Sequence, residues 1–188
     1  LALLPWREGM APSGSKGDIL LEKLAELTSS GTKIIVFSQF TSYLRILKKA
    51  ISQQIPDLQI LELTGSTRNR TLPVETFENA PGPTVILASL KAAGLGVTLK
   101  SADYVFLMDP WWNPAVEEQA IDRAHRLGRT KPTFVYRMVT KGTVEERVRA
   151  LQISKKEIFQ KIIGEMDRPN VLADHFSSLK DLVELTED

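Results

Sequence analysis

The chain has 188 residues, of which 43% are apolar and 25% charged, and its formal net charge is +1. This balance is typical of a soluble globular protein and neither favours nor excludes a nucleic-acid partner. Cysteine is absent and only two histidines occur, so we expect no disulfide, no metal site and an intracellular location. No apolar run approaches the roughly 18 residues that a membrane span needs.

The first segment with a structural pattern follows a stretch of 15 residues rich in Pro, Gly and Ser, which predicts a linker or arm. A helix is predicted over 16–29 and ends at Gly31. The residues expected on its buried side are Ile19, Leu20, Leu24 and Leu27. Because the chain begins with Leu1 rather than methionine, we expect it to be part of a longer protein.

Short apolar runs then alternate with helical patterns. Strands are predicted over 33–38, 58–63, 84–89, 104–109 and 133–139, and helices over 41–54, 73–79, 114–127 and 143–163. This alternation indicates an α/β fold with a parallel sheet covered by helices on both faces. Ligands of such sheets bind at the carboxyl ends of the strands. We therefore expect the polar loops 38–42, 64–70, 89–96 and 109–114 to gather along one edge.

The helix over 114–127 combines clear boundary signals with a basic face. Asn113 is a suitable N-cap and Pro114 a suitable first residue. At about 100° per residue, Gln119, Arg123 and Arg126 fall within a wedge of about 60°. An apolar stripe beside this wedge is formed by Val116, Ala120, Ala124 and Leu127. Guanidinium groups fixed there would match phosphate oxygens, although a solvated basic face with surface ion pairs is the ordinary alternative.

The loop "SLKAAGLG" at 89–96 contains two glycines that allow close approach of the backbone to a phosphate or ribose. Plain turn chemistry is the alternative explanation. The phosphate-binding pattern GxxxxGK(S/T) is absent, and no Asp-Glu pair follows a strand to hold Mg²⁺. The chain therefore lacks the parts that grip a nucleotide and its metal.

The end of the chain is predicted to be helical. Thr143 and Glu146 form a capping box that begins the helix through about residue 163, and Ser178 is a possible cap for a last short helix. Three parts result, with a linker at 1–15, a lobe at 16–142 and brace and tail helices at 143–188.

Four segments together resemble a known family. They read "KIIVFSQF", "LTGSTRNR", "ASLKAAGLGVTLKSADYVFLMDPWWNP" and "EEQAIDRAHRLGRT" in chain order. They are similar to helicase motifs four, five and six of the Swi/Snf-type DNA translocases in helicase superfamily two, over about residues 16–155. The resemblance implies a three-layer, RecA-like second lobe with a C-terminal helical appendage.

The resemblance also implies how ATP is used. In that family ATP is hydrolysed between two RecA-like lobes, and the second lobe supplies arginine fingers, here Arg123 and Arg126. Residues implied to line or order the nucleotide cleft are Gly94, Leu95, Gly96 and Gln119. ATP and Mg²⁺ are then held mainly by the first lobe, so this chain alone is expected to be inactive.

Duplex DNA is the second implied partner, contacted through its backbone. The implied contact residues are Ser38, Gln39, Gly65, Ser66, Arg70, Ser89, Lys91 and Trp112. The alternative is that Trp111 or Trp112 simply wedges the helix against the sheet. Arg129 and Ala93 depart from the family pattern, in which Gln and Gly are usual at these places.

We therefore expect the second motor lobe of an ATP-driven double-stranded DNA translocase of the remodeller or repair type, located in the cell on DNA. The alternative is a non-catalytic nucleic-acid-binding module, which predicts salt-sensitive DNA binding by this chain alone. A third possibility is a protein-interaction domain that docks through the helices of 143–188.

Overall fold

The structure is a computed structural model of the whole chain, and it describes residues 15–28, 31–93, 98–124 and 132–164. The predicted linker before residue 15 and the short helix predicted after Ser178 lie outside the described residues.

Five parallel strands form one sheet in the order β2-β3-β1-β4-β5. They are β1 (Lys33–Ser38), β2 (Gln59–Leu63), β3 (Thr84–Ser89), β4 (Tyr104–Leu107) and β5 (Phe134–Arg137). The predicted parallel α/β sheet is thereby confirmed. Strand β4 ends two residues earlier than expected, because Asp109 turns back towards the end of β1.

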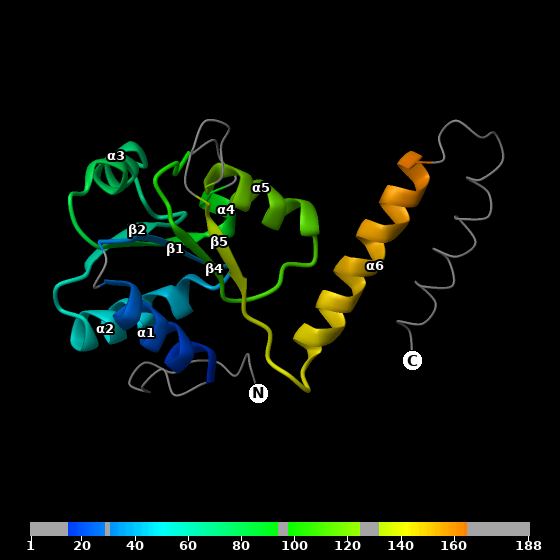
Figure 1. Cartoon of the computed structure of the whole chain (residues 1–188), viewed down its shortest axis with the longest axis horizontal. Helices are drawn as coiled ribbons and strands as arrows, with labels where there is room; N and C mark the ends of the chain where they lie inside the picture. The colour runs from blue at the N-terminus through cyan, green and yellow to red at the C-terminus, as the bar shows by residue number, and fades with distance from the viewer. Residues whose placement is uncertain (1–14, 29–30, 94–97, 125–131, 165–188) are drawn as a thin grey trace. The chain divides into compact units, whose positions relative to one another are not determined.

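Helices cover both faces of the sheet (Figure 1). The elements are α1 (Ser15–Thr28), α2 (Thr41–Gln54), α3 (Thr71–Asn79), α4 (Leu90–Ala93), α5 (Pro114–Ala124) and α6 (Val144–Gly164). Helices α1 and α2 pack on one face, and α3, α4 and α5 pack on the other. Helix α4 lies where the sequence predicted a loop, and it is capped by Ser89, whose Oγ accepts the Ala92 N–H at 3.3 Å.

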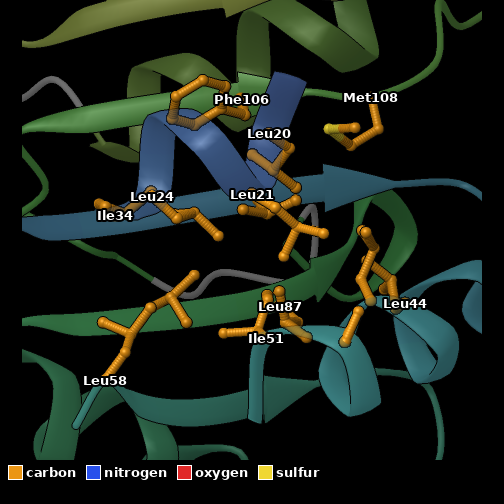
Figure 2. Packing of buried hydrophobic residues seen from close by; sticks show 14 of the residues in the cluster. Leu20, Leu21, Leu24, Ile34, Leu44, Ile51, Leu58, Leu87, Phe106 and Met108 are labelled. Carbon is orange, nitrogen blue, oxygen red and sulfur yellow. The ribbon is translucent and has the colours of Figure 1, made fainter. Parts of the chain in front are cut away.

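The two cores follow from strand periodicity, because successive side chains of a strand point to opposite faces. In β1, Ile34 and Val36 point towards α1 and α2, whereas Ile35 and Phe37 point towards α3, α4 and α5. Figure 2 shows the first core, in which leucines of the helices meet the strands. Its labelled members include Leu20, Leu24, Leu44, Ile51, Ile34, Leu87 and Phe106.

Helix α1 is rotated relative to the prediction. Ile19 is 45% exposed, whereas Leu21 is only 4% exposed and belongs to the core. Leu20, Leu21 and Leu24 form a stripe at i, i+1 and i+4. Ile19 precedes this stripe by one residue, a rotation of about 100° towards solvent. The expectation for Ile19 was therefore wrong, and Leu27 packs only partly against the core.

The sheet and its covering helices form one compact unit that extends to Val148, and a second unit begins at Arg149 within α6. The division into linker, lobe and brace stays a prediction. In the described residues, no helix is both long enough and apolar enough to cross a lipid bilayer.

Candidate functional site

Loops that follow β1 to β4 leave the sheet at the same edge, as expected for neighbouring parallel strands. The registers place Ser38 beside Ser89, Leu63 beside Ala88, and Phe37 beside Leu107. The loops after these positions carry most of the predicted DNA contacts. The predicted gathering of polar loops along one edge is therefore confirmed for these four strands.

A buried carboxylate organises this edge. Asp109 is 4% exposed, and its Oδ1 accepts a hydrogen bond from Ser38 Oγ at 2.5 Å. Its Oδ2 accepts the backbone N–H of Gln39 at 2.8 Å, while Ser38 Oγ accepts that of Phe40 at 3.0 Å. Asp109 thus joins the loop after β4 to the loop after β1. Sequence reasoning missed this role, although an acid at the end of an apolar strand pattern was a visible signal.

Burial raises the pKa of Asp109 above its usual value, while the hydrogen bonds from Ser38 and Gln39 and the nearby Lys16 ammonium oppose this shift. Lys16 donates to the carbonyl of Met108 at 2.8 Å and pairs with the carboxylate of Glu145. Glu145, in the first turn of α6, also accepts the Thr140 N–H at 2.8 Å. The ammonium of Lys16 on α1 and the carboxylate of Glu145 on α6 therefore both lie near enough to affect the charge of Asp109.

Two of the predicted DNA-contact residues are buried in this structure. The side chain of Ser38 is completely buried, and its hydroxyl is engaged by Asp109 and Phe40. Ser89 is 5% exposed and caps α4. In this structure both serines organise loops, and their contact with DNA stays a prediction.

The other predicted contact residues lie at or near the surface. Gly65, Ser66 and Lys91 are exposed, and Gln39 and Arg70 are half-buried. A Cβ added at Gly65 would meet no atom within 4 Å, so this loop leaves open space for an approaching ligand.

The two tryptophans differ in their surroundings. Trp111 is half-buried and packs against the core under α5, whereas Trp112 is 62% exposed. Trp111 therefore fills the wedging role that sequence reasoning considered for either residue. The turn ends at Asn113, whose Oδ1 accepts the Ala115 N–H at 3.1 Å, as expected for an N-cap.

Helix α5 places its polar face as predicted where it is described. Ala120 and Ala124 are buried, Gln119 is exposed and Arg123 is half-buried. The carbonyl of Arg123 accepts the Leu99 N–H at 3.0 Å, which joins the end of α5 to the segment after the glycine loop. The remaining predicted site residues, Gly94, Leu95, Gly96 and Arg126, lie outside the described residues, as does Arg129.

A second buried carboxylate was also missed. Glu117, in the first turn of α5, is 3% exposed and accepts the backbone N–H of Trp111 at 2.7 Å. Its other oxygen lies 3.5 Å from Nε of Arg137 in β5. In the sequence, an acid at this position indicates only a residue suited to the positive end of a helix. Within the described part of the chain, no group of three or more acids or histidines could hold a metal ion.

The chain matches the family model described as "Helicase conserved C-terminal domain" over residues 15–128. The match spans more than half of the chain, so the chain belongs to this family. It has the RecA-like fold of the C-terminal lobe of Swi2/Snf2-type ATPases, as the solved structures below show.

Among the relatives, the DNA repair protein RAD5A of Arabidopsis thaliana is 45% identical over 77% of this chain and 14% of that protein. The DNA repair protein rad8 of Schizosaccharomyces pombe is 44% identical over 74% of this chain and 12% of that protein. An uncharacterized ATP-dependent helicase of Mycoplasma pneumoniae is 40% identical over 84% of this chain and 15% of that protein. The chain therefore spans only a small part of the length of these relatives.

Two of the similar solved structures show the fold and family of this lobe. The C-terminal part of the Fun30 ATPase domain has a TM-score of 0.70 and 32% identity, over 78% of this chain and 47% of that chain. The SWI2/SNF2 ATPase core of Sulfolobus solfataricus, solved in complex with double-stranded DNA, has a TM-score of 0.67 and 32% identity. That match covers 86% of this chain and 34% of the other.

The structural role of Ser38 can be tested by Ser38→Ala. The change leaves a buried carboxylate oxygen and the Phe40 N–H without their hydroxyl partner, so we expect a loss of about 1–3 kcal/mol in the free energy of unfolding. The matched control is Ser66→Ala at an exposed position, expected within about 0.5 kcal/mol of wild type. Urea unfolding measures both, and an unchanged stability for Ser38→Ala would contradict the assignment.

The titration of Asp109 gives a pH dependence. Because burial raises its pKa in the folded protein, the folded form holds this proton to higher pH than the unfolded chain does. The associated stability is present at low pH and is lost as the pH rises above about 4 towards the folded pKa. Relative to Asp109→Asn, wild type should therefore lose free energy of unfolding as the pH rises. Urea unfolding at several pH values checks this, and a relative gain would contradict it.

Proposed function

We propose that the chain is the second motor lobe of an ATP-driven translocase that moves on double-stranded DNA in repair or remodelling. The lobe supplies arginine fingers and contacts to the DNA backbone, and it works inside the cell on DNA opposite an N-terminal RecA-like lobe of the same protein. The repair proteins and the DNA-bound ATPase core among the similar proteins support this proposal.

The observation that carries the nucleotide half of the proposal is the hydrogen bond from Leu99 N–H to the carbonyl of Arg123. It holds the end of α5 beside the segment that follows Gly94, Leu95 and Gly96. The described segments on either side of these glycines, α4 and Leu99, both lie against α5, which carries Arg123. This arrangement fits the two things that a triphosphate requires, which are close backbone approach and positive charge.

In this proposal Arg123 and Arg126 stabilise the charge that develops on the transferred γ-phosphoryl group. Gln119, exposed on the same face of α5, helps to order that surface. Mg²⁺, when bound with ATP, neutralises charge on the phosphates. In this proposal the acids that would hold it belong to the first lobe.

The DNA half of the proposal uses the exposed strand-end edge. Lys91 and Arg70 supply positive charge, Ser66 a hydroxyl, Gln39 an amide and Gly65 room for close approach. These groups position a phosphate chain without reading its sequence. Trp112, largely exposed on the turn before α5, offers an aromatic contact to the same duplex.

The arginine fingers are tested in the longer, two-lobed protein. Arg123→Ala and Arg126→Ala should each lower the kcat of DNA-stimulated ATP hydrolysis by about 10³-fold, because a finger acts mainly in the transition state. Arg45→Ala, which removes an exposed arginine from α2, serves as the matched control and should keep wild-type kcat. A wild-type kcat in both finger variants would refute the assignment.

Salt dependence tests the DNA contacts. Lys91→Ala and Arg70→Ala should each weaken duplex binding by the two-lobed protein and reduce the slope of log K against log salt by about 1. Lys49→Ala, at an exposed position of α2, should leave the slope unchanged. Titration of a labelled duplex at several salt concentrations measures the slopes, and equal slopes in all four proteins would remove these residues from the interface.

A further inference from the structure

The carboxylate of Glu117 makes tertiary contacts that a helix-capping acid does not need. An acid in the first turn of a helix stabilises the positive end of the helix dipole even when it is fully exposed. Glu117 is instead 3% exposed, and a carboxylate buried to this degree is costly unless hydrogen bonds and charges satisfy it.

The two oxygens of this carboxylate serve different elements. Oε1 accepts the backbone N–H of Trp111 at 2.7 Å, in the turn after β4. Oε2 lies 3.5 Å from Nε of Arg137, at the end of β5. Glu118 adds a longer contact of 3.8 Å to Arg137 Nη2 and is much more exposed. One side chain on α5 therefore joins the tryptophan-bearing turn to the last strand of the sheet.

Glu117 lies on the same helix as Arg123, so its contacts to Trp111 and Arg137 are linked to the position of that arginine. Arg123 follows six residues later, at a distance of about 9 Å along the helix axis. Because a hydrogen-bonded helix moves as a rigid rod over this length, a shift of the turn at Trp111 changes the placement of Arg123. The same turn carries Trp112, the aromatic side chain that is exposed at the strand-end edge.

We propose that Glu117 is a positioning residue that couples DNA contact at the tryptophan turn to the placement of the arginines on α5. This inference rests on the proposed function, because it requires DNA at the turn and ATP at the helix. Glu117 contacts neither ligand itself and acts through the backbone of Trp111 and through Arg137.

The test uses the two-lobed protein and the ratio of kcat with saturating duplex DNA to kcat without DNA. Glu117→Ala removes the contacts to Trp111 and to Arg137, and this stimulation ratio should fall roughly two- to thirty-fold. Glu117→Gln keeps an oxygen that can accept the Trp111 N–H but loses the charge facing Arg137, so it should recover part of the ratio. Glu118→Ala removes an equal charge from the same helical turn and should stay close to wild type.

A second readout is independent of activity. Hydrogen exchange at the Trp111 amide, followed by NMR on this chain, should be faster in Glu117→Ala than in wild type. The amide should stay protected in Glu117→Gln and in Glu118→Ala. If Glu117→Ala does not fold, Arg137→Gln replaces it in the ATPase assay and should lower the stimulation ratio in the same direction.

The possible outcomes distinguish a failure of the proposed function from a failure of the coupling. A wild-type two-lobed protein whose ATPase does not respond to duplex DNA overturns the proposed function, and the coupling with it. A wild-type protein that responds, together with an unchanged ratio in Glu117→Ala, overturns the coupling alone. Basal and stimulated rates that fall by the same factor, with no recovery in Glu117→Gln, also overturn it, because they show a purely structural role.

Discussion

The candidate site depends on the buried carboxylate of Asp109. Strands β1 and β4 are neighbours in the sheet, but pairing alone leaves the loops beyond them free to diverge. Asp109 accepts one hydrogen bond from the Ser38 hydroxyl and one from the Gln39 N–H, so both loops are held to a single carboxylate. These bonds, with the Lys16 ammonium nearby, offset part of the cost of removing the charge from water.

A second carboxylate, that of Glu117, holds the turn between β4 and α5 from its other end. Asp109 binds the start of the turn to β1, and Glu117 binds Trp111 to α5 and faces β5 through Arg137. The turn is therefore fixed from both directions, while Trp112 stays exposed on it. Both carboxylates are buried and accept directional hydrogen bonds from the backbone. These bonds specify the orientation of the turn more strictly than apolar packing alone would.

Much of the fold could be predicted because its signals are local. The apolar runs of the strands and the cap and proline at the start of α5 are readable within a few residues of sequence. The roles of Ser38 and Asp109 were not readable in this way, since these partners are separated by 71 positions and meet only through the sheet. A serine at the end of a strand looks the same whether its hydroxyl faces a phosphate or a buried acid. The rotation of α1 was missed for a related reason, because Ile19 and Leu21 are both apolar and tertiary packing decides which one is buried.

The strand order has a consequence for how the chain reaches this structure. Strand β1 is synthesised first and occupies the middle of the sheet, yet Ile34 pairs with Val85 and Tyr104, which emerge from the ribosome much later. Until then both edges of β1 are unpaired and its apolar side chains are uncovered. A strand in this state is prone to aggregate. Closing these long loops is also slow compared with forming a helix. The lobe is therefore expected to depend on chaperones during synthesis more than a helical bundle of equal length would.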